Sequence, residues 1–149
     1  MRLDQPGLRL TCQADTLLVE NRQAAEIVAD RFAQLGVFWT AGFTSAEGLD
    51  ARGQLTAQVG GVIACPDTDL VGVRIVEQIL SVTPHAEVLD IGTHPHERRR
   101  PWKPESTSVV GLRAASDGPA GVLARACLAR GYPVEQELAA LDALVELLS

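Results

Sequence analysis

Three carboxylates follow two strand-like apolar runs in this 149-residue chain. Glu20 comes directly after Leu17–Val19, while Asp67 and Asp69 come just after Val62–Cys65. A helical pattern follows each run. In a parallel α/β sheet the carboxyl ends of the strands gather along one edge, where such folds place their chemistry. We therefore expect the three acids to converge at one point, with Asp67 and Asp69 on the same side of an extended backbone.

Carboxylates held this close repel one another unless a positive charge lies between them. Mg²⁺ prefers oxygen ligands and keeps waters that phosphate can displace, and a metal of this kind can activate water or stabilise the leaving oxygen in phosphodiester cleavage. We expect Mg²⁺ or Mn²⁺ here, with Asp67 and Asp69 as ligands and Glu20 as a ligand or a general acid/base. The plain alternative is that Asp69 or Thr68 only caps the next helix.

The elements that must position these acids read as alternating strands and helices. This alternation predicts an α/β domain, a Rossmann-like and mostly parallel sheet of about four strands flanked by helices. We expect a single domain over residues 1–149, with a core at about 15–92, an irregular basic loop at about 93–107 and a C-terminal helical part at about 118–149. The expected strands are 16–19, 37–40, 62–65 and 87–91, and 109–112 is either a fifth strand or a linker. The expected helices are 22–35, a stretch opened by a Thr44/Glu47 capping box, about 70–84, 120–130 and 134–148.

Composition sets the broad class. The chain is 46% hydrophobic and 21% charged, which is ordinary for a globular protein. No apolar run approaches the length of a membrane span, and the first residues lack the hydrophobic core of a signal peptide, so we expect a cytoplasmic protein without a membrane partner. The net charge of −6 argues against autonomous tight DNA binding. The three cysteines lack the spacing of zinc or disulfide sites.

The runs TLLVEN at 16–21, FWTAGF at 38–43 and DTDLVGVRI at 67–75 together resemble a known family. They are similar to the TOPRIM domain of the nuclease subunit of Wadjet-type plasmid-defence systems, and also to that of the A subunit of type IIB topoisomerases. The resemblance covers about 16–137. It implies a TOPRIM-like fold and metal-dependent DNA cleavage, with Glu20, Asp67 and Asp69 carried over as the acids.

The same resemblance leaves Glu135 and Glu137 as possible further ligands, although a solvated helix face is the simpler interpretation. Relatives of this family carry a DNA-binding region ahead of the TOPRIM domain, so we expect DNA as a partner together with other protein subunits or a missing region. Topoisomerases also need a nucleophilic tyrosine on a separate module, and the single Tyr132 is expected to be a packing residue. Topoisomerase activity is therefore not expected of this chain alone.

Two other classes of function stay open. One is a TOPRIM-like module that binds partners without catalysis. The other is a nickel-linked endopeptidase of the hydrogenase-maturation type, which residues 71–77 and 87–93 resemble. In that interpretation Asp69 would contact nickel. A cobalamin-binding domain is a weaker third alternative. The cluster Arg98–Lys103, with Trp102, is compatible with phosphate and base contacts, a solvated loop or a subunit contact. His94 and His96 are expected to be exposed.

Overall fold

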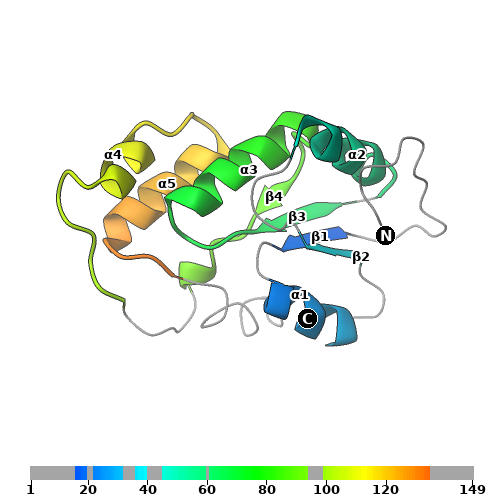
Figure 1. Cartoon of the computed structure of the whole chain (residues 1–149), viewed down its shortest axis with the longest axis horizontal. Coiled ribbons are helices and arrows are strands. Elements are labelled where there is room, and N and C mark those ends of the chain that lie inside the picture. Colours follow the sequence, from blue (N-terminus) through cyan, green and yellow to red (C-terminus); the bar gives the residue numbers. More distant parts are fainter. Residues whose placement is uncertain are drawn as a thin grey trace.

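The computed structural model describes residues 16–19, 22–31, 36–39, 45–59, 61–93 and 99–134. Strands and helices alternate through its first part and two helices follow (Figure 1), so the mixed α/β architecture expected from the sequence is confirmed. In chain order the elements are β1 (Thr16–Val19), α1 (Arg22–Arg31), β2 (Gly36–Trp39), α2 (Ala46–Thr56), β3 (Val62–Cys65), α3 (Leu70–Val82), β4 (Glu87–Val88), a 3₁₀ turn (Ile91–Thr93), α4 (Thr107–Arg113) and α5 (Pro119–Arg130).

The strands are short, lie parallel, and follow the order β2-β1-β3-β4. Because β1 pairs with both β2 and β3, the chain steps first to one side of β1 and then to the other. In open α/β sheets this reversal is where ligands bind, beyond the carboxyl ends of the strands. Val19 lies opposite Cys65, so the last residues of β1 and β3 are direct neighbours. The two strands therefore end at the same edge, at the reversal.

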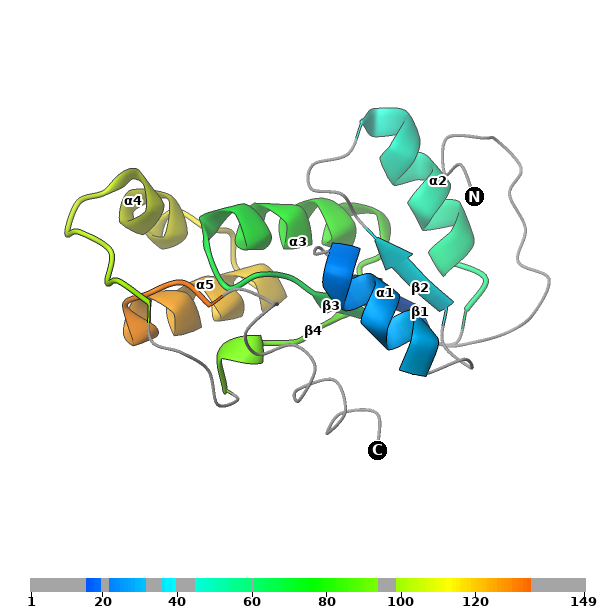
Figure 2. The same cartoon turned by 60° about the horizontal axis from the view of Figure 1, so that its bottom comes forward.

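Helices cover both faces of the sheet. Helix α1 lies on one face, and α2 and α3 lie on the other (Figures 1 and 2). The apolar face of α3 fills the space above β3, since Ile75 and Ile79 pack with Val62 and Ala64. The opposite side of the same helix supplies Leu70, Val73 and Val76 to a second core shared with α4 and α5. Helix α3 is thus the element to which both halves of the molecule attach.

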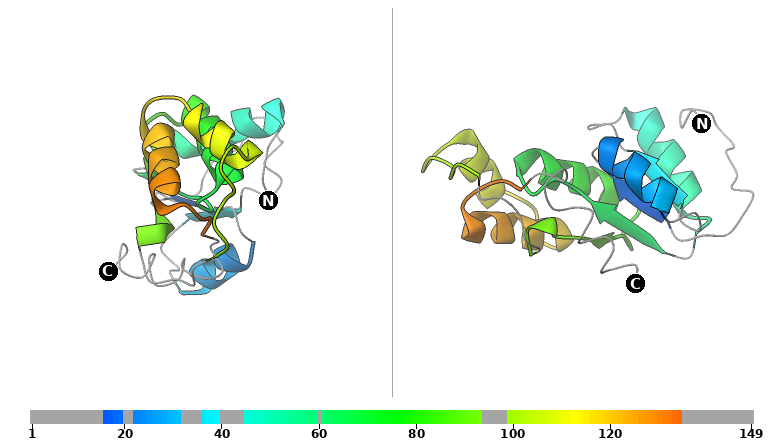
Figure 3. Two further views of the ribbon diagram at one scale, coloured as in Figure 1. Left: turned by 90° about the vertical axis from the view of Figure 1, so that its left-hand side faces the viewer. Right: turned by 90° about the horizontal axis from the view of Figure 1, so that it is seen from below.

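Helices α4 and α5 lie at one end of the molecule and α2 at the other (Figure 3). Helix α5 packs against α3 and β4, and α4 packs against both α3 and α5. From β3 the chain runs toward the α4–α5 end before it enters α3 (Figure 1). The carboxyl edge of β3, with the expected acids, therefore faces the end that holds α4 and α5.

Several boundaries differ from the sequence-based expectations. Residues 109–112 form part of α4 and not a strand, because Ser106 caps the helix by accepting a hydrogen bond from the Val109 N–H (3.3 Å). The fourth strand keeps only Glu87–Val88, and the chain then turns into the 3₁₀ segment. Ser45 caps α2, because its hydroxyl accepts a hydrogen bond from the Gly48 N–H at 3.2 Å, and Thr44, the expected first residue of the capping box, lies outside the described residues.

The expected helix 134–148 lies outside the described residues except for Val134, which forms an isolated antiparallel bridge with Thr68. The irregular character expected between 93 and 107 is seen over 99–106, and 94–98 lie outside the described residues. Among the helices that the structure describes, none is both long enough and apolar enough to cross a bilayer.

Candidate functional site

The turn that follows β3 carries two of the three expected acids. Asp67 and Asp69 are half-buried, whereas Thr68 between them is completely buried. The Thr68 backbone pairs with Val134, donating from its N–H at 2.9 Å and accepting at 3.4 Å. This pairing holds the turn extended, so side chains alternate across it. The alternation of exposure along 67–69 follows from this geometry.

Thr68 anchors the turn from within. Its hydroxyl donates to the Val134 carbonyl (3.2 Å) and accepts from the Val134 N–H (3.1 Å). The Arg130 guanidinium also donates to this hydroxyl, at 3.4 Å. Because every one of these partners comes from the end of α5 or just after it, the turn between β3 and α3 is fixed by a distant part of the chain. Thr68 does not cap α3.

Asp69 is the residue that caps α3. Its backbone is extended (φ −147°, ψ −177°), and Oδ1 accepts a hydrogen bond from the Gly72 N–H at 2.8 Å. A side chain at residue 72 would collide with the Asp67 carbonyl oxygen, so only glycine allows the helix to begin this close to the turn. The capping role considered from the sequence is therefore present. It uses one carboxylate oxygen, and Oδ2 is not needed for it.

A fourth acid, Asp90, comes shortly after the end of β4 and binds the last residue of α5. Arg130 Nη2 lies 2.9 Å from Asp90 Oδ2 and 3.2 Å from Oδ1, and the Gly92 N–H donates to Oδ1 at 2.9 Å. The pair is largely buried, with 12% of the Arg130 side chain and 21% of the Asp90 side chain exposed. A side chain at Gly92 would collide with the guanidinium. Arg130 thus joins the residues that follow β3 to those that follow β4.

Cys127 shows how close these charges lie to one another. Burial, and after it the nearby Asp90 carboxylate, raise the pKa of its thiol to about 12, while Arg130 acts in the opposite direction. Asp69 also raises this pKa. Asp69 and Asp90 therefore act on one sulfur atom from the same region of the molecule. The thiol stays protonated near neutral pH, which makes it a poor nucleophile.

Glu20, the third expected acid, lies outside the described residues. The same holds for Glu135, Glu137, His94, His96 and Arg98. Among the residues that the structure describes, no three His, Cys, Asp or Glu side chains gather closely enough to hold a metal ion. The described turn offers two carboxylates, half-buried and two residues apart, at the edge where β1 and β3 end. Hard oxygen donors in this setting suit Mg²⁺ or Mn²⁺, with a third ligand supplied from elsewhere.

The basic cluster divides into two kinds of residue. Arg99, Arg100 and Lys103 are exposed. Trp102 packs its side chain against the core shared by α3, α4 and α5, and its backbone N–H donates to the Gly131 carbonyl at 3.0 Å. The indole therefore anchors the segment, and this position does not favour base stacking, one of the alternatives left open by the sequence. Tyr132 is half-buried, in keeping with a packing role.

An apolar groove of about 490 Å³ runs between β4 and α5. Val88, Pro119, Val122 and Leu123 line it, and Asp90 is its charged member. Since that carboxylate already binds Arg130, the groove has no converging polar groups for an anionic substrate. Its lining therefore does not offer the pair of carboxylates on which the chemistry expected from the sequence depends.

Sequence reasoning identified Asp67 and Asp69 from their place after a strand, but it missed Asp90 and Arg130 as a pair. Asp90 carried the same signal, because it is an acid that follows a short apolar run. The expected strand 87–91 included Asp90, so this residue was not identified as the acid that follows the strand. Arg130 carried only the weak signal of a cation in the last turn of a helix. No protein-family model and no curated protein sequence matches this chain.

Proposed function

We propose that this chain is a TOPRIM-like domain that binds Mg²⁺ or Mn²⁺ at the Asp67–Asp69 turn and supports phosphodiester cleavage in DNA. One observation carries the proposal. The strand order reverses between β1 and β3, and Val19 lies opposite Cys65 at that point. The acids that follow these two strands in the sequence are therefore candidates for one site, because ligands in open α/β sheets bind at such a reversal.

Each residue has a definite part in this proposal. Asp67 and Asp69 would hold the metal, Asp69 through the oxygen that does not cap α3. Glu20 would be a further ligand or the general acid/base that moves a proton at the scissile bond. When bound, the metal would activate water or stabilise the leaving oxygen. Thr68 and Arg130 position the turn, since their hydrogen bonds tie it to Val134 and Asp90.

The proposal also extends to the setting of the reaction. Residues that bind DNA would come partly from other subunits or from a DNA-binding region, as the TOPRIM resemblance implies. The chain would act in the cytoplasm, where its substrate lies. Anti-plasmid defence is the biological role that the same resemblance suggests. The sheet would be the Rossmann-like core of the TOPRIM fold.

Calorimetric titration with Mn²⁺ tests the metal site without any need for activity. The wild-type chain should show saturable binding, and Asp67→Asn and Asp69→Asn should each weaken it at least about tenfold, the effect of losing about 1.4 kcal/mol. Asp50→Asn is the matched control, because Asp50 is an exposed carboxylate on α2 at the other end of the molecule. Plasmid nicking by the chain with its partner subunits should fall with the same two variants and not with the control.

Equal Mn²⁺ affinity in the wild type and both site variants would refute the site. Binding of Mn²⁺ without any nicking by the assembly would refute the reaction and support a non-catalytic interaction module. Selective binding of nickel over Mn²⁺ would support the endopeptidase interpretation instead.

A further inference from the structure

Positive charge is concentrated in one part of this acidic protein. Residues 99–134 contain six Arg or Lys and two acidic residues, although the whole chain has a net charge of −6. Arg130 is neutralised by Asp90. The other cations of this part, together with Arg74 on α3, give the α4 end of the molecule a sign opposite to that of the rest. An asymmetry of this kind is typical of a surface that meets a polyanion.

We propose that Arg74, Arg100, Lys103 and Arg113 form a surface, here called the α4 surface, that binds the phosphate backbone of double-stranded DNA without metal. The inference rests on the proposed function in its choice of DNA as the polyanion. It goes beyond it by assigning where the duplex lies and which residues hold it.

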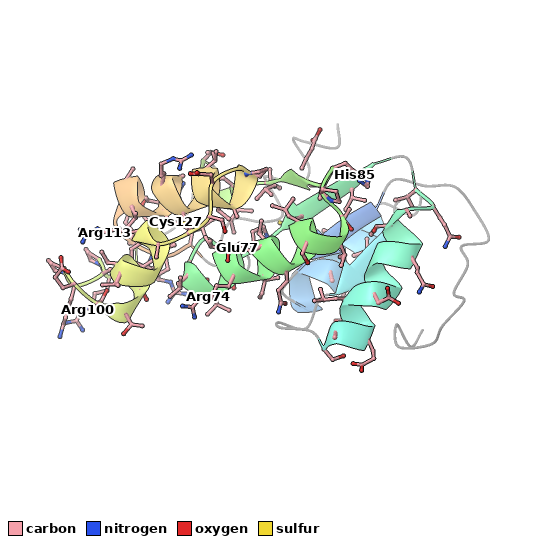
Figure 4. The ribbon with its side chains drawn as sticks, turned by 90° about the horizontal axis from the view of Figure 1, so that it is seen from above. Arg74, Glu77, His85, Arg100, Arg113 and Cys127 are labelled. Atoms are coloured by element: carbon pink, nitrogen blue, oxygen red, sulfur yellow. The ribbon has the colours of Figure 1, made fainter. Side chains whose placement is uncertain are left out.

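Packing fixes α4 and the loop after it against α3, which carries Arg74. Helix α4 lies against the first turn of α3, where Gly111 contacts the Leu70 side chain. The loop after α4 is tied to α3 as well, since Ser116 donates to the Glu77 carboxylate from its N–H (3.1 Å) and from its hydroxyl (2.6 Å). Figure 4 shows Arg74 and Arg100 on the same edge of the molecule, on either side of α4.

The segment that carries Arg100 and Lys103 is held at two points. Trp102 anchors it on the core, and Ser106 joins it to α4 as the cap. The cations are therefore presented by ordered backbone, which lowers the entropy lost when they bind an anion.

The positive charges of the α4 surface are available to a ligand. Arg74, Arg100 and Lys103 are exposed, and no carboxylate among the described residues pairs with any of them. The nearest acid along α3, Glu77, accepts both hydrogen bonds from Ser116 at Oε1 and forms no ion pair with Arg74. Arg113 pairs with Glu105 at 3.1 Å, but both side chains are more than half exposed, at 59% and 75%. Such an exposed pair contributes little, so a phosphate can replace Glu105.

The aromatic residues argue for a duplex over a single strand. Proteins that bind single strands without sequence preference stack the bases on exposed aromatic rings. Trp102 and Tyr132 are the aromatic residues of 99–134, and neither is exposed. The α4 surface thus offers charge without a stacking platform, which suits contacts to a phosphate backbone.

The α4 surface and the candidate site share the first turns of α3. Arg74 is five residues beyond Asp69, which corresponds to about 7.5 Å along the axis of α3 and about 140° around it. The two side chains therefore lie on different sides of the helix, and only a ligand wider than a single side chain can contact both. One duplex could contact the α4 surface and reach the proposed metal.

Fluorescence anisotropy with a labelled 20-base-pair duplex in EDTA tests this inference. The triple variant Arg74→Gln/Arg100→Gln/Lys103→Gln should bind at least about tenfold more weakly at 50 mM salt, and the slope of log K against log salt should fall by about 3. The matched control is Ala46→Glu/Gln54→Glu/Ala57→Glu, which lowers the net charge by the same three units at exposed positions of or just after α2, at the far end of the molecule. It should bind within about twofold of the wild type.

Asp67→Asn separates this inference from the proposed function. It should bind the duplex in EDTA at least as well as the wild type while losing Mn²⁺ binding. Wild-type affinity in the triple variant, an equal loss in the α2 control, or no binding of duplex by the wild type at 50 mM salt would each overturn the α4 surface. Tighter binding of a single strand than of the duplex would overturn the choice of duplex.

Discussion

Asp69 is assigned two roles, the cap of α3 and a ligand of the metal, and substitutions can separate them. In EDTA, Asp69→Ala should lower the free energy of unfolding by about 1 kcal/mol, because it removes the 2.8 Å hydrogen bond to the Gly72 N–H. For a chain of this length that loss corresponds to about 2–4 °C in Tm. Asp69→Asn keeps an acceptor of similar capping strength, so its Tm in EDTA should stay within about 1 °C of the wild type.

Metal should separate the wild type from both variants. With Mn²⁺ at about 100 times its dissociation constant, the wild type should gain about 2.7 kcal/mol, or roughly 5–10 °C in Tm. Both Asp69→Asn and Asp69→Ala should lose about half of this gain or more, because a neutral amide or a methyl group is a weaker ligand for a hard cation than the carboxylate. Asp50→Asn should keep all of it.

Differential scanning calorimetry of the four proteins, with EDTA and with Mn²⁺, gives each result directly. If Asp69→Asn destabilises the chain in EDTA as much as Asp69→Ala does, the capping argument is wrong. If Asp69→Asn retains the full increase with Mn²⁺, Asp69 is not a ligand and the proposed site fails.

Two further predictions follow from the region around α5. Arg130→Met should lower the free energy of unfolding by about 2 kcal/mol, because Asp90 is left unpaired in a largely buried position. Adding Asp90→Leu should recover part of that loss. Arg113→Met breaks an exposed pair and should lower the free energy of unfolding by less than about 0.5 kcal/mol. Equal losses in urea unfolding from Arg130→Met and Arg113→Met would contradict this assignment. The second prediction concerns pH. Burial, and after it Asp90, raise the pKa of Cys127 to about 12. The unfolded chain therefore releases this proton at a lower pH than the folded chain. The stability that this difference contributes is complete below pH ~8.5 and is lost as the pH rises toward 12. Between pH 9 and 10.5, Cys127→Ala should therefore show a shallower fall in unfolding free energy than the wild type, by up to about 1.4 kcal/mol per pH unit; parallel slopes would show that the thiol is not shifted.

The sequence was informative wherever structure depends on neighbours in the chain. The apolar runs before Glu20 and Asp67 predict strands because a buried parallel strand needs little else, and the helical spacing of Val73, Val76 and Ile79 predicts α3. The place of Asp67 and Asp69 after β3 follows from the same local pattern. These parts of the fold, and the position of the two acids after β3, were predicted correctly from the residues.

The sequence was uninformative where distant residues decide. Residues 109–112 are too few to show a period, and their helix depends on the Ser106 cap and on packing of Gly111 against Leu70, about forty residues away. The Arg130–Asp90 pair likewise joins residues forty positions apart. Neither contact leaves a local pattern that a single sequence could reveal.

Arg130 matters for the candidate site through its charge as well as its hydrogen bonds. Three carboxylates, those of Asp67, Asp69 and Asp90, follow β3 and β4, and the Arg130 guanidinium of α5 pairs with the last of them. The formal charge of the carboxylates and the guanidinium together is −2, which one divalent cation would neutralise. Without Arg130 the same acids would form a region of higher negative charge, which would repel the polyanion that we propose as the ligand. If both proposals hold, the guanidinium lets the carboxylate site and the α4 surface share one end of α3, because it cancels the one acid that the proposed metal does not use.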